Sequence, residues 1–297
     1  AGAPQRRERR RVTEALRTAD EWFDALPLPP PRYLEWQELR LHYTDEGDGA
    51  PVVLFHGEPT WGFLYRKVAA ELLAAGHRVV IPDLPGFGRS DKPVAADWYT
   101  SDRHTEAMRS VIEHLDLRGA TAVVQDWGGP IGLRLAIEHP DRFGRLSILN
   151  TGLFTGRARM SEGFLRWRAF AETVEVMEIG RLMRSSMVRE WPDEVVAGYD
   201  APFPTPGHTM GARRFPLIVP MSETDPGAAE MQAVLTALGG WDRPTQVLFS
   251  TDDPIFPVRP MSPAGPPEPS GPLAPGRYRA RVDGGWVEVP VAAMGEE

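Results

Sequence analysis

Asp126 lies in the stretch VVQDWGGP, residues 123–130, where an apolar run ends and an amphipathic stretch begins. This pattern predicts a nucleophile elbow, a sharp turn between a strand and a helix that exposes one side chain at the edge of a sheet. Gly128 and Gly129 leave room for the bend, and the helix that follows directs its N-terminal amides at the carboxylate. A simple helix N-cap would give the same pattern, so a second motif must decide.

That second motif is HGEPTW, residues 56–61, which directly follows the apolar stretch PVVLF. In α/β hydrolases this loop supplies one backbone N–H of the oxyanion hole, and the residue after the nucleophile supplies the other. We therefore expect the N–H groups of Glu58 and Trp127 to form an oxyanion hole. His56 is interpreted as a residue that braces the turn by hydrogen bonding, not as a catalytic base.

Three stretches, HGEPTWGFLYRK, PDLPGFGRSDKP and VVQDWGG, together resemble the haloalkane dehalogenases, from about Leu16 to Pro257. GFLRW and DAPFPTPGHTMGARRFP are similar to the cap of the subgroup whose catalytic acid follows a late strand. In that family two indole N–H groups hold the departing halide, and the matching positions are Trp127 and Trp167. The alternative for Trp167 is an ordinary core aromatic on a cap helix.

The resemblance gives the carboxylate of Asp126 a chemical purpose. Displacing halide from an sp³ carbon needs an anionic nucleophile held in line and a partner for the leaving group. Chloride and bromide are weak bases, so hydrogen-bond donors such as indole suffice. The product is an alkyl ester on Asp126, which water hydrolyses with the help of the oxyanion hole and a histidine base. The expected partners are a small halogenated alkane, water and halide, without a cofactor or a metal.

The family's catalytic acid matches Asp253 in LFSTDDPIF, and the neighbouring Asp252 is interpreted as a turn residue. Other subgroups place the acid after the strand that reads RLSILN here, where this chain has the uncharged Asn150.

The family's histidine follows the acid, but the last of the seven histidines in this chain is His208. We therefore expect the alkylation half of the reaction to be intact and the hydrolysis half to be impaired. His56, His104 and His208 are the histidines that would have to substitute, and each would need the right geometry first.

Two other functions fit parts of the sequence. Epoxide hydrolases share the fold and an aspartate at the elbow, but their alkoxide leaving group needs an acid, usually tyrosines of the cap. The expected cap has only Tyr199, and HGEP with Trp167 fits halide better. A paralogue that has lost catalysis and kept the pocket is the third possibility.

The hydrophobic pattern predicts the elements that hold these residues. Strand-like and helical stretches alternate, which is typical of an α/β fold with a mostly parallel sheet. Ser101 or Asp102 is expected to cap the helix that follows Thr100. A helical cap is expected to interrupt this α/β-hydrolase core. The predicted division is a tail and proline-rich lead-in (1–32), core (33–152), cap (153–220), core (221–257) and an atypical Pro/Gly-rich C-terminus (258–297) in which a hairpin forms about residues 283–285.

Composition limits the remaining choices. The chain has 297 residues, a formal net charge of −8 and no cysteine, which excludes disulfides and argues against nucleic acid or an anionic membrane as a partner. No apolar run approaches the ~20 residues that span a bilayer. The basic start leads into no apolar signal-peptide segment, so a cytoplasmic, monomeric protein is expected.

Overall fold

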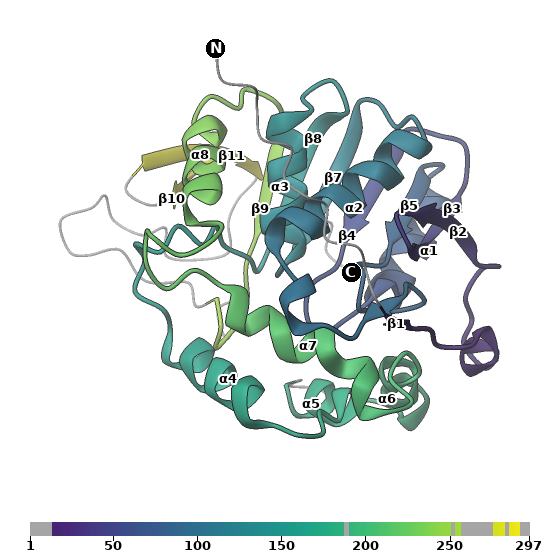
Figure 1. Ribbon diagram of the computed structural model, residues 1–297. Coiled ribbons are helices and arrows are strands. Elements are labelled where there is room, and N and C mark those ends of the chain that lie inside the picture. Colours follow the sequence, from purple (N-terminus) through teal and green to yellow (C-terminus); the bar gives the residue numbers. More distant parts are fainter. Residues whose placement is uncertain (1–13, 187–189, 251–252, 257–275, 283–284, 292–297) are drawn as a thin grey trace, which may run out of the picture.

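A computed structural model of the protein describes residues 14–186, 190–250, 253–256, 276–282 and 285–291 (Figure 1). The start of the predicted N-terminal tail (1–13), Asp252 and the proline-rich run 258–275 lie outside these residues. No helix in the described ranges is long and apolar enough to cross a membrane.

A seven-stranded sheet forms the centre of the molecule, in the order β2-β3-β5-β4-β7-β8-β9. The strands β2 and β3 run antiparallel to their neighbours, and the other adjacent pairs are parallel, as the alternation in the sequence predicted. The strands are β2 (Arg32–Trp36), β3 (Leu39–Glu46), β4 (Pro51–Phe55), β5 (Arg78–Pro82), β7 (Ala120–Gln125), β8 (Phe143–Leu149) and β9 (Thr245–Leu248).

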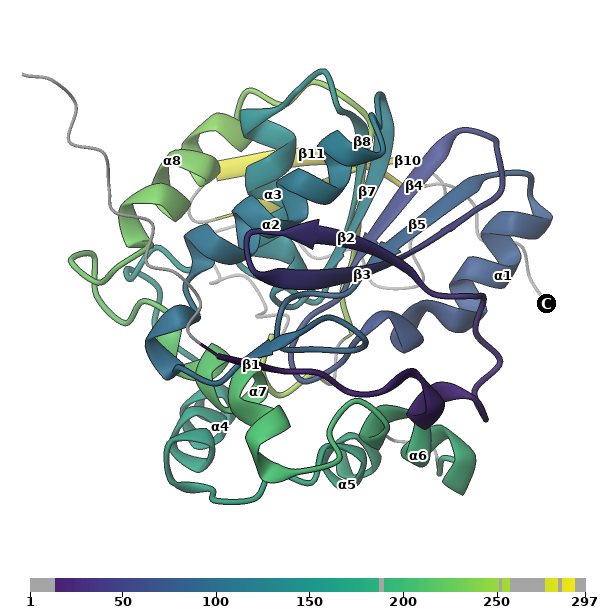
Figure 2. The same cartoon turned by 45° about the vertical axis from the view of Figure 1, so that its right-hand side comes forward.

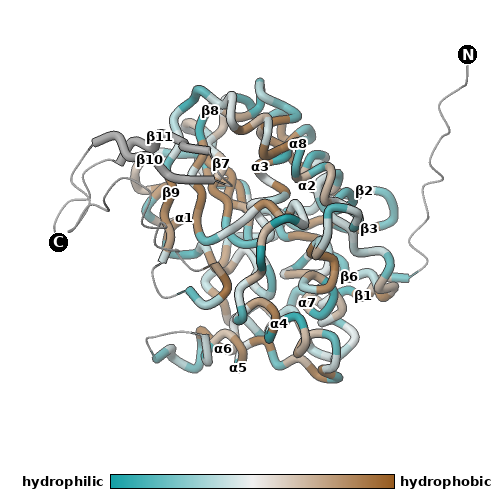
Figure 3. Tube along the Cα trace, turned by 90° about the vertical axis from the view of Figure 1, so that its left-hand side faces the viewer, coloured by the Kyte–Doolittle hydropathy of each residue, from teal (hydrophilic) through white to brown (hydrophobic). Residues whose placement is uncertain are grey.

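Helices cover both faces of the sheet because its central strands are apolar on both sides. In β4, Val53 and Phe55 pack into the larger core on one face, and Val52 and Leu54 into a smaller core on the other. Figure 3 shows these apolar segments along the central strands. The larger core lies under α2 (Ser101–His114), α3 (Gly128–Glu138) and α8 (Ala228–Leu238), and the smaller one under α1 (Arg66–Ala74).

The N-cap of α2 differs from the prediction. Thr100 has extended backbone angles, and its hydroxyl accepts the N–H of Arg103 at 3.3 Å. Ser101 and Asp102 are already inside the helix, so neither can act as its cap. The sequence offers three adjacent residues that favour N-caps, and only the point at which the backbone turns helical selects among them.

Four helices lie together beyond the carboxyl ends of the parallel strands, at the bottom of Figures 1 and 2. They follow β8 and precede α8, as expected for an inserted helical cap. These cap helices are α4 (Glu162–Thr173), α5 (Ile179–Ser185), α6 (Asp193–Asp200) and α7 (Met210–Arg214), with the 3-10 turns η4 (Pro206–Thr209) and η5 (Phe215–Ile218). Two indole N–H groups tie this layer to the core, because Trp61 donates to the carbonyl of Gly198 and Trp167 donates to Glu58.

Smaller elements complete the described chain. β1 (Ala15–Leu16) pairs with β6 (Lys92–Pro93), and short 3-10 turns form at η1 (Asp20–Phe23), η2 (Gly62–Tyr65) and η3 (Ala96–Trp98). The predicted C-terminal hairpin is confirmed, because β10 (Gly276–Val282) pairs antiparallel with β11 (Gly285–Val291). It is a separate two-stranded sheet, and β11 lies beside β9.

Candidate active site

Asp126 occupies a strained turn between β7 and α3. Its φ angle is +50°, in the left-handed region that non-glycine residues rarely adopt. Backbone hydrogen bonds hold this turn. The Asp126 N–H donates to the carbonyl of Asn150, and the Gly129 N–H donates to the carbonyl of Asp126. A Cβ at Gly128 would lie 2.1 Å from the carbonyl oxygen of Phe55, so a larger residue there would push the elbow away from β4.

Two backbone N–H groups converge on one oxygen of the Asp126 carboxylate. Glu58 donates its N–H to Oδ1 at 2.7 Å, and Trp127 donates to the same atom at 2.6 Å. The other oxygen, Oδ2, accepts no hydrogen bond within the described part of the chain. Gly57 permits this approach, because a Cβ on it would lie 2.2 Å from the Cβ of Asp126. The carboxylate is therefore fixed through one oxygen and open at the other.

The surroundings of Asp126 raise its pKa to about 6. Loss of hydration is the largest cause, and the charge of Asp253 adds to it, whereas the two N–H donors act in the opposite direction. The carboxylate is still the dominant form at neutral pH. A poorly hydrated anion with one free oxygen is a good nucleophile.

The two indoles predicted to hold halide have different partners. The indole N–H of Trp127 has no hydrogen-bond partner within the described part of the chain. The indole ring packs edge-on against Phe215, with 4.9 Å between the ring centroids. The Trp167 N–H, which comes from α4 in the cap, donates to Oε2 of Glu58 at 3.1 Å. Glu58 therefore contacts the nucleophile through its backbone and the cap through its side chain.

The side chain of Glu58 is a functional candidate that the sequence motif did not reveal. It is 9% exposed, and its Oε1 is buried without a hydrogen-bond partner from the described residues. Burial, followed by the negative charge of Asp126, holds the pKa of Glu58 well above its usual range. The motif had predicted a role only for its backbone N–H, because a side chain's partners in the cap are not encoded locally.

Asp253 lies beside the elbow, as its predicted role requires. Its Oδ1 accepts the N–H groups of Ile255 and Phe256, and its Oδ2 accepts the side-chain N–H of Asn150 at 2.5 Å. Asn150 also accepts the Asp126 N–H through its carbonyl, so one residue connects the acid position with the nucleophile. The sequence had marked Asn150 only as an uncharged replacement.

The histidines considered as a substitute base have other partners or apolar surroundings. His56 contacts the carbonyl of Gly57 through Nδ1 at 2.9 Å and accepts the Leu84 N–H through Nε2, which confirms its predicted bracing role. His104 is buried among aromatic rings with a pKa lowered to about 3 by burial, and His208 pairs with the hydroxyl of Thr205. His42 is paired with Asp83.

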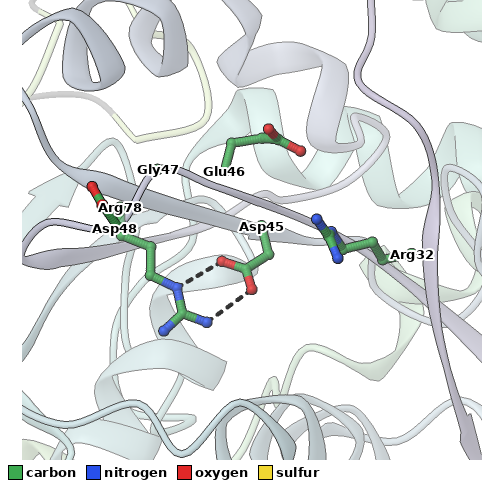
Figure 4. A pocket seen from close by; sticks show the side chains of 6 residues that line it. All are labelled: Arg32, Asp45, Glu46, Gly47, Asp48 and Arg78. Atoms are coloured by element: carbon green, nitrogen blue, oxygen red, sulfur yellow. Dashed lines mark hydrogen bonds and ion pairs between the residues drawn. The ribbon is translucent and has the colours of Figure 1, made fainter.

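The surface pocket in Figure 4 lies at the amino ends of the parallel strands, whereas the elbow lies at their carboxyl ends. It is an open depression of about 410 Å³ where β3 ends and β5 begins, lined by Arg32, Asp45, Glu46, Gly47, Asp48 and Arg78. Arg78 and Asp45 form a two-pronged ion pair there, at 2.7 and 2.8 Å. Its charges compensate one another, and no residue of the candidate site contributes to it.

Known proteins resemble this chain in sequence and in fold. Residues 50–175 match the family described as the alpha/beta hydrolase fold. A haloalkane dehalogenase of Psychrobacter cryohalolentis is 47% identical over 249 residues, 81% of this chain and 82% of the relative. A haloalkane dehalogenase of Mycobacterium marinum is 50% identical, covering 73% and 74%. The chain belongs to the haloalkane dehalogenase family.

A solved structure supports the family assignment in three dimensions. The tetrameric haloalkane dehalogenase of Paraglaciecola agarilytica matches with a TM-score of 0.78 and 35% identity, over 82% of this chain and 85% of that one. The α/β-hydrolase fold predicted from the sequence is thereby confirmed, as is the resemblance to haloalkane dehalogenases.

Proposed function

We propose that this haloalkane dehalogenase relative displaces halide from an sp³ carbon with the carboxylate of Asp126. The observation that carries the proposal is the asymmetric carboxylate, in which Oδ1 accepts two backbone N–H bonds and Oδ2 has no partner among the residues that the structure describes. Oδ2 attacks the carbon as the carbon–halogen bond breaks, and the halide leaves with the bonding electrons. Trp127 and Trp167 hold the departing halide with their indole N–H groups.

The same two donors serve the second step. In the alkyl ester, Oδ1 becomes the carbonyl oxygen, and attack by water at Cγ moves negative charge onto it. The N–H groups of Glu58 and Trp127 already lie within hydrogen-bond distance of that oxygen, so they form the oxyanion hole. The tetrahedral intermediate then expels the alcohol and restores the carboxyl group of Asp126.

We propose that hydrolysis of the alkyl ester is the slower of the two steps. The family's base follows the acid, but no histidine follows Asp253 in the 297 residues. His56 uses one ring nitrogen for the HGEPTW turn and the other for the Leu84 N–H, and His104 lies in an apolar shell. Asp253 therefore shapes the elbow through Asn150 and places negative charge beside it, without a histidine of its own to orient.

Epoxide hydrolysis is less well supported. Tyr199, the expected acid of that reaction, is 1% exposed and stacks on Trp191 with ring centroids 5.1 Å apart. Burial raises the pKa of Tyr199, although its interaction with Arg66 acts in the opposite direction, so its hydroxyl is a weaker acid than an exposed tyrosine.

The nucleophile is tested by replacing Asp126 with asparagine. The parent chain should release bromide from a bromoalkane, whereas Asp126→Asn should release none, because an amide oxygen is a much weaker nucleophile than a carboxylate. Intact mass must first show that the amide has not reverted to aspartate. Bromide release at the parent rate from verified Asn protein would contradict the assignment.

A further inference from the structure

Glu58 places a buried carboxyl group between the nucleophile and the cap. Its backbone N–H donates to Asp126 Oδ1 at 2.7 Å, so Glu58 is hydrogen-bonded directly to the reacting carboxylate. Its far end is fixed by the Trp167 indole, which donates to Oε2 at 3.1 Å. The remaining oxygen, Oε1, is buried and has no partner in the described ranges of the chain, so one acceptor stays free beside the site.

We propose that the Glu58 carboxylate is the base that activates water for hydrolysis of the alkyl ester on Asp126. This inference rests on the proposed alkylation of Asp126. It assigns to the side chain of the oxyanion-hole residue the proton transfer for which the 297 residues offer no histidine after Asp253.

Charge coupling links the protonation of Glu58 to the state of Asp126. Burial is the main cause that raises the pKa of Glu58, and the negative charge of Asp126 adds to it, so both favour a protonated Glu58 beside the anionic nucleophile. Alkylation turns Asp126 into a neutral ester and removes the second cause. The pKa of Glu58 is thereby lowered, and the hydrogen bond from Trp167 favours the ionised form further. Alkylation thus moves Glu58 towards the form that can accept a proton.

The protons balance over a full cycle. After alkylation Glu58 releases its proton to solvent, and its carboxylate then takes a proton from the attacking water as the new carbon–oxygen bond forms. Collapse of the tetrahedral intermediate breaks the bond to the alkyl oxygen, which receives the proton from Glu58 and leaves as alcohol. Asp126 emerges as a carboxylic acid and returns its proton to Glu58. The net change is alkyl halide and water to alcohol, halide and one proton.

The groups around Glu58 are less suited than Glu58 to accept a proton from the attacking water. Asp126 on the elbow is the charged group that acts on it, and Asp253 lies beyond Asp126 with its carboxylate already accepting three N–H bonds. From α4 comes the uncharged Trp167. Tyr65, which also senses the charge of Asp126, is buried and donates its hydroxyl to the carbonyl of Phe55.

The test follows the alkyl adduct after a single exposure to a bromoalkane. Glu58→Gln keeps the backbone N–H and an oxygen that can accept from Trp167, but it cannot take a proton. We expect the adduct to form in both proteins and to decay about 10²-fold or more slowly in the Gln variant, the usual effect of losing a positioned base. Glu46→Gln, on the remote depression of Figure 4, is the matched control and should decay as the parent does.

A pH profile of the parent chain gives a second readout without any mutation. Adduct decay should rise with pH through one ionisation and then level off, and the Gln variant should lack that step. Equal decay in the parent and the Gln variant, or a parent adduct that never decays at any pH, would overturn the role of Glu58. If the folded parent forms no adduct and releases no bromide, the proposed alkylation itself fails.

Discussion

At the scale of single residues, the two indoles of the halide site start from different states. The N–H of Trp127 has no partner within the described part of the chain, whereas the N–H of Trp167 is bonded to Glu58. A halide therefore gains a new hydrogen bond from Trp127 but must replace an existing one at Trp167. A bond to a charged group contributes about 1.5–3 kcal/mol, so Trp127 should contribute more to halide affinity.

Phenylalanine substitutions test this difference, because they keep most of the ring and remove only the N–H. We expect Trp127→Phe to weaken halide binding about tenfold or more and Trp167→Phe to weaken it less, measured by halide quenching of tryptophan fluorescence. Trp241→Phe is the control, since its indole lies beside Arg243, which contacts the backbone near β8, and should not change the quenching. Unchanged halide affinity in Trp167→Phe would return that residue to the cap core.

Which residue roles could be predicted depended on how locally they are encoded. The donors on Asp126 Oδ1 are backbone groups of two short motifs, so the motifs alone placed them. The bond between Trp167 and Glu58 joins side chains 109 positions apart, one in the cap and one in the core. No local pattern specifies such a contact, and the role of the Glu58 side chain therefore required the structure.

At the scale of elements, the elbow between β7 and α3 holds a carboxylate where its charge is unfavourable. The folded chain binds the Asp126 proton more tightly than the unfolded chain does, because the pKa rises from 3.8 to about 6. Asp126 therefore favours folding at low pH, and this contribution is lost as the pH rises through about 6. The full shift corresponds to about 3 kcal/mol, and partial exposure of the side chain reduces that figure.

Asp126→Asn should accordingly stabilise the protein while it abolishes the chemistry. The amide oxygen can accept the same two N–H bonds without a charge, so the free energy of unfolding should rise by about 1–3 kcal/mol near pH 8 and by less near pH 5. Denaturant unfolding at both pH values measures this. The exposed Asp116, whose pKa is lowered first by Arg142 and then by Arg118, is the control, and Asp116→Asn should show no gain. A loss of stability in Asp126→Asn at both pH values would contradict the expected cost.

Element prediction succeeded where burial determines the pattern and failed where alternatives are equivalent. The buried strands β4 and β5 carry short continuous apolar stretches and were evident from the sequence. The N-cap of α2 was wrong by one residue, because Thr100, Ser101 and Asp102 can all cap a helix and only the backbone angles distinguish them.

At the scale of the whole molecule, the cap and the core both contribute residues to the proposed site. The core supplies Asp126, its two N–H donors and the acid position Asp253, and the cap supplies the indole of Trp167. The α/β core was predictable because its motifs lie at strand ends. The pairing of cap and core depends on long-range side-chain contacts, and the predicted domain limits remain proposals.

Intact-mass analysis during a burst experiment is the most direct test of the two-step chemistry. Mixed with excess bromoalkane, the parent chain should release about one bromide per enzyme rapidly and then continue much more slowly, because alkylation needs no base, whereas hydrolysis needs one and the chain has Glu58 in place of the family's histidine. The protein should gain the mass of one alkyl group, located by peptide mapping on the peptide that contains Asp126. Rapid sustained bromide release without any adduct would contradict slow hydrolysis, and a folded protein that yields neither bromide nor adduct would contradict the nucleophile itself.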